Sequence, residues 1–229
     1  MLPSTIPIFP LPNVVLFPSV FLPLHIFEPR YRQMLADALS GDRIIGMVLL
    51  KDARDPGEQP GRLPAAPAAD LPVPRDGRDG QKPPVYDVGC AGLISHAERL
   101  ADGRSNIILR GIERFRIVAE VGGRAYRRAE IAPLPETDSE RIRDELRRLR
   151  TRLDPLVGDR FDNAKWRRMV PADMGDDALV NTLAQYLDLE PVEKQALLEQ
   201  GDVAGRSSAL IDLIEMHAFA ARTGRAGPQ

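Results

Sequence analysis

Two hydrophobic patterns divide the chain. Up to about residue 135, apolar positions fall in short runs or alternate with polar ones, as Phe115 and Ile117 alternate with arginines, which is the period of β-strands. Beyond that point they recur at intervals of three and four residues, as on one face of a helix. We therefore expect an α+β protein with a β-barrel subdomain over residues 1–135, a helical bundle over 136–221 and a disordered tail over 222–229.

The first part is predicted to hold six or seven strands, enough to close a small barrel. The expected strands are Thr5–Phe9, Val20–Ile26, Ile44–Leu50, Val85–Leu100, Arg104–Arg110, Ile112–Val121 and Arg124–Leu134. Asp102-Gly103, Gly111 and Gly122-Gly123 separate the last four strands at the spacing of β-meander turns.

Prolines mark two segments. Seven of the 21 prolines fall in the first 29 residues among apolar residues, which predicts short strands joined by a buried or bound extended loop, because proline cannot donate to a sheet ladder. Eight more fall within residues 52–84, which we interpret as a flexible Pro-rich loop that acts as a lid, acts as a linker or has no role. Between these segments, Glu28-Pro29 opens a helix that Ser40-Gly41 ends.

The second part is predicted to be a bundle of three or four helices with apolar stripes. The expected helices are Thr137–Leu156, Ala178–Leu187, Pro191–Leu198 and Val203–Ala221. The stripe of the first helix consists of Ile142, Leu146, Leu149, Leu153 and Leu156.

Composition limits the function classes. A chain of 229 residues, 43% hydrophobic and 28% charged, buries one large or two small cores, which excludes global disorder. A net charge of -2 gives no overall attraction to nucleic acid or an anionic membrane, and a single cysteine excludes a disulfide framework. No apolar run reaches about 18 residues, and the N-terminal segment lacks the basic start of a secretory signal. We expect a soluble cytoplasmic protein.

Catalytic motifs do not emerge. No Gly-Lys dipeptide exists to form a P-loop, and neither Ser105 nor Ser207 lies in a G-x-S-x-G motif. The three histidines are far apart in sequence, and Cys90 lies in an expected barrel strand, where a buried inert thiol is the usual state. We expect no catalytic residue, no metal site and no cofactor.

One run of residues, Leu22 to Tyr31, has two interpretations. Phe27, Arg30 and Tyr31 could anchor a partner, because aromatic residues and arginine concentrate binding energy. The structural alternative is a strand-to-helix corner in which Glu28 caps the helix, Arg30 pairs with an acid and Tyr31 packs. On these residues alone, the structural alternative is favoured.

The segment IPIFPLPNVVLFPSVFLPLHIFEPRYRQMLADAL, residues 6–39, resembles the start of the Lon N-terminal domain, the substrate-binding portion of the ATP-dependent protease La. Later blocks resemble this family in the same order: VYDVGCAGLI from Val85, NIILRGIERFRI from Asn106, YRRAEI from Tyr126 and LDLEPVEKQALLE from Leu187. The resemblance implies a PUA-like β-pseudobarrel followed by a helical bundle.

The chain also departs from the family. Full-length Lon continues into an ATPase domain and a Ser-Lys protease domain, and none of Lys51, Lys82, Lys165 and Lys194 lies in a setting resembling that dyad. A peptidase activity inherited from the family name is therefore not expected. The Pro-rich segment 52–84 is longer than the connection usual in the family.

The leading hypothesis is a non-catalytic protein-binding module in protein quality control that recognises unfolded polypeptide or a specific protein partner. Its candidate contacts are Phe17, Phe21, Phe27, Arg30 and Tyr31. The alternative is an RNA-binding module, which rests on fold analogy alone and which the net charge does not favour. An autonomous peptidase ranks last, and no membrane contact is expected.

Overall fold

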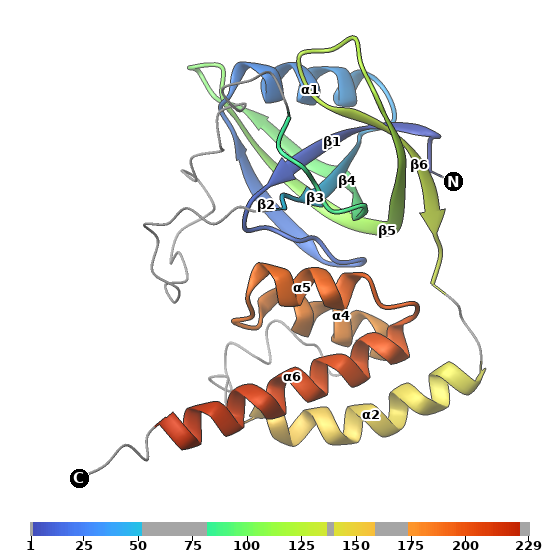
Figure 1. The fold of residues 1–229 in the computed structure, drawn as a ribbon. Helices are drawn as coiled ribbons and strands as arrows, with labels where there is room; N and C mark the ends of the chain where they lie inside the picture. Colours follow the sequence, from blue (N-terminus) through green and yellow to red (C-terminus); the bar gives the residue numbers. More distant parts are fainter. Residues whose placement is uncertain (1, 52–81, 137–139, 159–173, 225–229) are drawn as a thin grey trace. The chain divides into compact units, whose positions relative to one another are not determined.

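The computed structural model describes residues 2–51, 82–136, 140–158 and 174–224 (Figure 1). Their contacts divide the chain into two compact units. The first contains the residues up to Pro135 together with Asp188–Leu198, and the second contains Glu136–Leu187 and the chain from Glu199 onward. The segment Asp188–Leu198, which the sequence analysis placed in the helical bundle, thus belongs to the β unit.

The first unit is a small barrel of six strands. They are β1 (Thr5–Leu11), β2 (Phe21–Ile26), β3 (Ile44–Leu49), β4 (Val88–Arg99), β5 (Ser105–Val121) and β6 (Arg128–Leu134). They are ordered β2-β5-β4-β3-β1-β6, and a further pairing of β5 with β6 closes the ring. β1 and β3 are parallel, whereas the other pairs are antiparallel. The expectation of an α+β fold is confirmed.

Strand β5 is long enough to serve two partners. Residues 105–110 pair with β2, and residues 114–121 pair with β6, so β2 is an extra strand beside the ring. The prediction of a turn at Gly111 is wrong, because strand β5 continues through this residue. A Cβ atom on Gly111 would lie 2.0 Å from the carbonyl oxygen of Phe17, so glycine is needed for close backbone approach.

The barrel core is apolar. Ile6, Ile8 and Phe115 are at most 1% exposed, and a Cβ atom on Gly89 would come within 2.8 Å of the Phe115 ring. Helix α1 (Pro29–Ser40) begins with proline and is followed by Gly41, as the sequence predicted. Its buried residues are Tyr31, Met34, Leu35 and Ala38.

Helix α5 (Pro191–Leu198) is held to the barrel by two buried polar side chains. Gln195 Nε2 donates to the carbonyl oxygen of Val88 at 3.0 Å, and Arg114 Nη1 donates to that of Leu198 at 2.9 Å. A guanidinium at the C-terminal end of a helix also meets the negative end of the helix dipole. These contacts give a physical reason for this segment's place in the first unit.

The second unit contains α2 (Glu140–Gly158), α4 (Asp176–Tyr186) and α6 (Val203–Gly224). Of the stripe expected on α2, Leu146, Leu149 and Leu153 are buried, and the side chains of Ile142 and Leu156 lie outside the described residues. Among the helices described, none is long and apolar enough to cross a membrane.

The segment predicted to be a Pro-rich loop lies mostly outside the described residues. Of the tail predicted over residues 222–229, residues 222–224 are the end of α6, and residues 225–229 lie outside the described residues. The ends of the Pro-rich segment are described. Leu50 and Val85 form an isolated antiparallel bridge, and the Lys51 N–H donates to the carbonyl oxygen of Pro84 at 2.8 Å. The chain therefore leaves and re-enters the barrel at one place.

Candidate functional site

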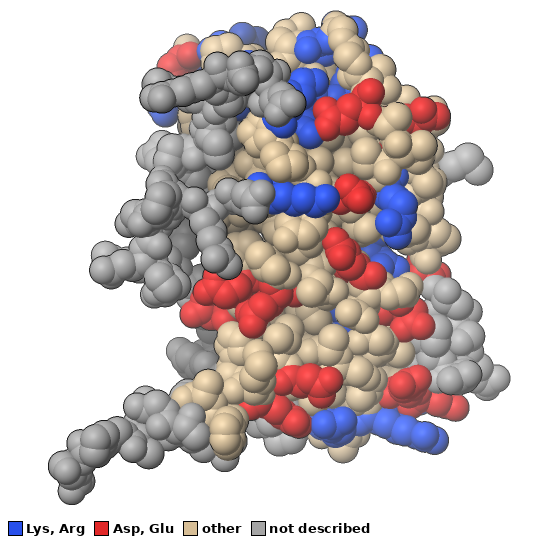
Figure 2. All heavy atoms as spheres, in the orientation of Figure 1, with Lys and Arg blue, Asp and Glu red and all other residues tan. Residues whose placement is uncertain are grey.

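Charge is mixed over the surface. On the face drawn in Figure 2, basic and acidic side chains are interspersed, with apolar and neutral surface between them. Several arginines are paired with nearby acids, as Arg104 is with Asp102 and Arg127 with Glu120. This mixed distribution differs from the clustered positive charge that is typical of phosphate-binding surfaces. Exposed apolar side chains are therefore a better guide to a binding site on this protein than its charged side chains.

Strand β2 presents apolar side chains on both of its faces. Leu24 and Ile26 point inward and are at most 6% exposed. Phe21 is 52% exposed, and Pro23 on the same side is also exposed. Because side chains alternate along a strand, the residues at 21, 23 and 25 share the outer face.

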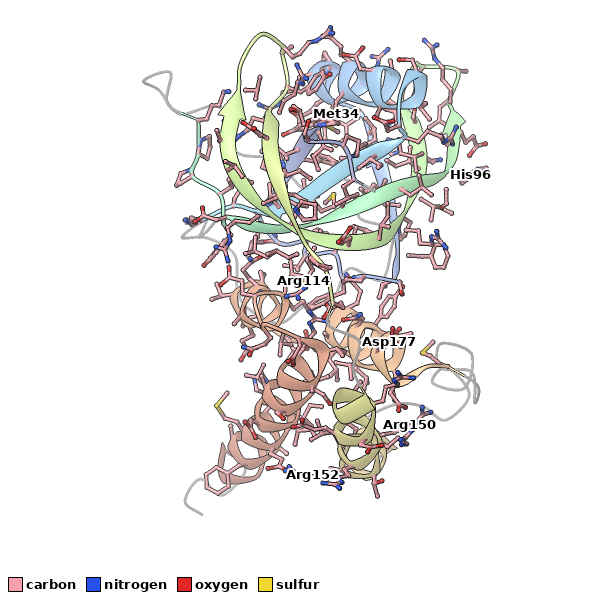
Figure 3. The ribbon with its side chains drawn as sticks, turned by 90° about the vertical axis from the view of Figure 1, so that its right-hand side faces the viewer. Met34, His96, Arg114, Arg150, Arg152 and Asp177 are labelled. Carbon is pink, nitrogen blue, oxygen red and sulfur yellow. The ribbon has the colours of Figure 1, made fainter. Side chains whose placement is uncertain are left out.

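The neighbouring half of β5 extends this outer face. Phe21, Pro23 and His25 lie opposite Arg110, Ile108 and Asn106. Together with Phe27, which directly follows β2 and is 38% exposed, these six residues form what we call the β2 face. β4 continues it, because His96 lies opposite Ile108, and Figure 3 shows His96 on the outside of the barrel.

One end of the β2 face is ordered by polar contacts. The Nδ1–H of His25 donates to Asn106 Oδ1 across the strands at 2.7 Å. The imidazole also stacks with the ring of Phe27, with 6.2 Å between centroids. These contacts fix the His25 ring and place Phe27 beside it, so this end of the β2 face is preorganised.

The structure separates four of the five candidate contact residues into two groups by their exposure. Phe21 and Phe27 are on the β2 face, where a partner can reach them. Phe17 is 0% exposed and Tyr31 is 3% exposed, so both side chains belong to the core and a partner cannot contact them. Phe17 is buried because the loop that carries it packs against β5 at Gly111.

The corner before α1 agrees with the structural alternative in the pairing of Arg30 and the packing of Tyr31, but not in side-chain capping by Glu28. Arg30 Nε donates to Glu28 Oε2 at 3.0 Å, and its guanidinium lies 4.7 Å from the centre of the Tyr31 ring. Tyr31 in turn packs on Phe9, with 4.4 Å between ring centroids. Glu28 makes no side-chain capping hydrogen bond and is instead the ionic partner of Arg30.

Sequence reasoning missed the contribution of β5. Asn106, Ile108 and Arg110 alternate with the buried residues Ile107 and Leu109. This period-two pattern places the three side chains on one face of a strand. Only the register with β2 shows that this face continues the one that carries Phe21.

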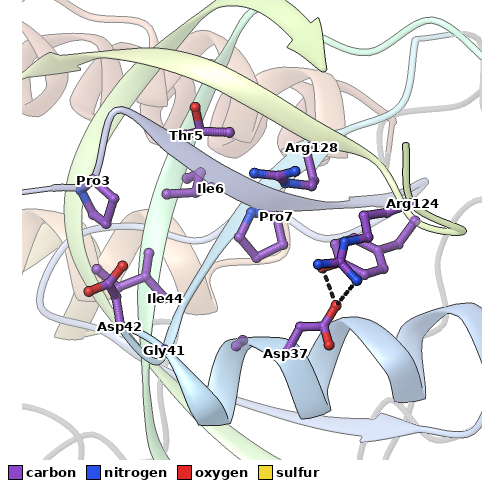
Figure 4. A pocket seen from close by; sticks show the side chains of 12 residues that line it. Pro3, Thr5, Ile6, Pro7, Asp37, Gly41, Asp42, Ile44, Arg124 and Arg128 are labelled. Carbon is purple, nitrogen blue, oxygen red and sulfur yellow. Dashed lines mark hydrogen bonds and ion pairs between the residues drawn. The ribbon is translucent and has the colours of Figure 1, made fainter. Parts of the chain in front are cut away.

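A second feature is a small cleft beside α1 (Figure 4). Its volume is about 190 Å³, below the roughly 300 Å³ at which ligand pockets begin. The Tyr126 hydroxyl donates to Asp37 Oδ2 at 2.7 Å, and Arg124 lies 3.5 Å from the same oxygen. Burial and the hydrogen bond to Asp37 raise the pKa of the Tyr126 hydroxyl. These three groups satisfy one another, so we assign the cleft a structural role.

Residues 5–216 of the chain match the family of the substrate-binding domain of the ATP-dependent protease La (Lon). The chain belongs to this family. It is 27% identical over 215 residues to a Lon protease of Paraburkholderia phytofirmans and 26% identical over 219 residues to Lon protease 2 of Myxococcus xanthus. These alignments cover 90% and 93% of this chain but only 24% of each relative, so the chain spans about a quarter of their length.

Solved structures give the same fold. The N-terminal domain of Lon protease from the Mycobacterium avium complex superposes with a TM-score of 0.66 at 18% identity, covering 93% of this chain and 99% of that one. A Lon N-terminal domain protein from Xanthomonas campestris superposes with a TM-score of 0.55 at 20% identity, covering 91% and 98%. The predicted resemblance to the Lon N-terminal domain is confirmed.

Proposed function

We propose that this Lon substrate-binding domain acts in protein quality control as a non-catalytic module that binds extended apolar segments of unfolded polypeptide on the β2 face. The observation that carries the proposal is the pair of exposed phenylalanines, Phe21 and Phe27, on one side of a sheet whose other side is core. Isolated exposed apolar residues are ordinary, but aromatic residues grouped on a rigid surface are typical of binding sites.

The mechanism is apolar burial on a surface that needs little reordering. Fully burying a phenylalanine contributes about 2–3 kcal/mol, so covering the exposed half of Phe21 contributes about 1 kcal/mol before ordering costs. Several such contacts give weak, sequence-tolerant binding, which suits a protein that must accept many unfolded segments. The family is that of a substrate-binding domain, which supports this assignment.

The test is fluorescence anisotropy of a labelled, permanently unfolded polypeptide at about 50 and 200 mM salt. Apolar burial predicts saturable binding that is nearly equal at both salt concentrations. Phe21→Asp should weaken binding about tenfold and leave the circular dichroism spectrum unchanged, because the side chain is already half-exposed. Binding that collapses with salt would instead indicate contacts driven by charge and would contradict binding by apolar burial.

A matched control lies on the other half of β5. Val118 is 61% exposed and lies outside the β2 face, so Val118→Asp introduces the same charge on the same barrel. It should bind the polypeptide as the unaltered protein does. Equal losses in the two variants would contradict the assignment of binding to the β2 face.

The non-catalytic part of the proposal has its own measurement. Incubation of the purified chain with the same unfolded polypeptide, with and without ATP, should leave the polypeptide intact on a denaturing gel. Fragments that appear in proportion to the chain and disappear in a single-residue variant would contradict it.

A further inference from the structure

The β2 face carries one positive charge beside its apolar residues. Arg110 lies directly opposite Phe21 in the pairing of β2 with β5, and Ile108 is its neighbour two residues away on the same face. Opposite residues in an antiparallel pair have Cβ atoms about 5 Å apart. A partner that covers Phe21 therefore comes within reach of the Arg110 guanidinium.

This guanidinium is not used by the fold. Arg110 is exposed, and within the part of the chain that the structure describes its side chain forms no hydrogen bond or ion pair. Arginines with a structural role here behave differently. Arg114 on the same strand is 3% exposed and bonds the end of α5, and Arg30 pairs with Glu28. Arg110 is thus available to a partner.

Among the described residues of this sheet, the acids nearest in register are Glu113, three residues from Arg110 along β5, and Glu98 of β4, which lies opposite Asn106, four residues from Arg110. Three and four residues of a strand span about 10 and about 13 Å, each more than the Debye length of about 8 Å at about 0.15 M salt. The end of the face that holds Phe21 is therefore locally positive, although the chain as a whole carries a net charge of -2.

We infer that the β2 face selects apolar polypeptide segments that carry a carboxylate, and that Arg110 is the residue that makes this selection. This inference rests on the proposed function and specifies its substrate class. Arginine presents a planar fork of donors that fits a carboxylate, and an apolar residue beside that carboxylate covers Phe21 at the same time. A segment with lysine in that place brings two positive charges together and is disfavoured.

The test uses three extended peptides with the same apolar residues and one variable position, filled by Glu, Gln or Lys. Binding to the unaltered protein should follow the order Glu, Gln, Lys, with about a two- to fivefold loss from Glu to Gln, the range of an exposed ion pair. That preference should shrink as salt is raised, whereas the binding of the Gln peptide should hardly change.

Charge reversal distinguishes selection from a general charge effect. Arg110→Glu should make the Lys peptide the tightest binder. Arg116→Glu makes the same charge change on the same strand, outside the β2 face and at another exposed side chain, and should leave the order unchanged. Circular dichroism of both variants should match the unaltered protein, because both side chains are exposed.

The outcomes separate this inference from the proposed function. If Phe21→Asp weakens binding about tenfold but Arg110→Glu leaves the preference for the Glu peptide unchanged, the apolar site stands and the selection by Arg110 is overturned. If no peptide binds the unaltered protein, both are overturned. If Arg116→Glu changes the order as much as Arg110→Glu does, net charge and not the β2 face sets the preference, which also overturns the inference.

Discussion

The two units of the molecule bury different kinds of residue. The barrel is filled by aliphatic and aromatic side chains, of which Ile8 and Phe115 are 0% exposed. Among the described residues of the helical unit, the largest fully buried side chain is that of Arg206, also 0% exposed. Its Nη1 donates to Asn181 Oδ1 at 2.8 Å, and its Nη2 donates to Glu136 Oε1 at 2.7 Å. The barrel unit also buries a guanidinium, that of Arg114, but this group bonds a backbone carbonyl at the end of α5, whereas Arg206 joins the side chains of two other segments of its unit. The barrel core thus depends on apolar burial, and the helical unit depends in addition on a buried network of charged and polar side chains.

This difference bears on function. An apolar core closed by a ring of strand pairings gives a rigid sheet, and a rigid sheet holds Phe21 and Phe27 in place without a partner. A buried guanidinium is costly once any of its partners is lost. The barrel is therefore the better platform for a binding face, and the helical unit is the more sensitive to single polar substitutions.

Arg206→Asn should produce the largest effect. The shorter amide cannot reach both Glu136 and Asn181, so buried polar groups lose their partners in the helical unit, at a cost of about 3–5 kcal/mol. Hydrogen exchange should show α2, α4 and α6 opening while the barrel strands stay protected. Arg148→Asn, at an exposed position on α2, is the control and should change stability by less than about 0.5 kcal/mol. Equal opening in both units would contradict the contrast between them.

Arg114→Ala tests the polar contact of the barrel unit. Without the guanidinium, the carbonyl oxygen of Leu198 loses its donor, and we expect a loss of about 1–3 kcal/mol that is concentrated on α5. The measurement is amide hydrogen exchange of α5 compared with β4. Arg116→Ala, at the exposed position two residues along β5, should leave α5 protected. Loss of protection throughout the barrel would mean that the ring depends on this charge.

Tyr126→Phe should have the smallest effect, about 1 kcal/mol at neutral pH, because it removes one hydrogen bond to Asp37. The pKa of Tyr126 is raised above its ordinary value of about 10, so folding favours the protonated hydroxyl. The contribution of the Tyr126 hydroxyl to the free energy of unfolding is complete below about pH 10 and is lost as the pH rises through the folded-state pKa. Urea unfolding between pH 8 and 12 should therefore show a shallower alkaline decline for Tyr126→Phe. Parallel declines would contradict this assignment.

Local signals in the sequence predicted most of the elements. Pro29 and Gly41 bound α1 as expected, and Pro191 begins α5 as expected, because these residues act on the backbone within one turn. The prediction at Gly111 was wrong because this glycine is required by a tertiary contact and not by a turn. It admits the backbone of Phe17 from a loop about ninety residues earlier in the sequence, and a glycine required for close approach looks the same in sequence as one in a turn.

The candidate site was predictable only in part. Phe17, Phe21, Phe27 and Tyr31 lie in one Pro-rich apolar stretch, and no pattern there separates the two exposed rings from the two buried ones. Their separation follows from packing partners that are distant in sequence. Arg110 was hidden for the same reason, because its place opposite Phe21 depends on the register of β2 with β5.

The most direct test of the central claim is methyl NMR of the isoleucine and valine residues during titration with an unfolded polypeptide. Ile108 lies on the β2 face, and Val118 lies on the same strand outside it. We predict shifts at Ile108 that saturate with the binding isotherm and no shifts at Val118 beyond the noise. Saturating shifts at Val118 or in the helical unit, with Ile108 unchanged, would contradict the assignment of polypeptide binding to the β2 face.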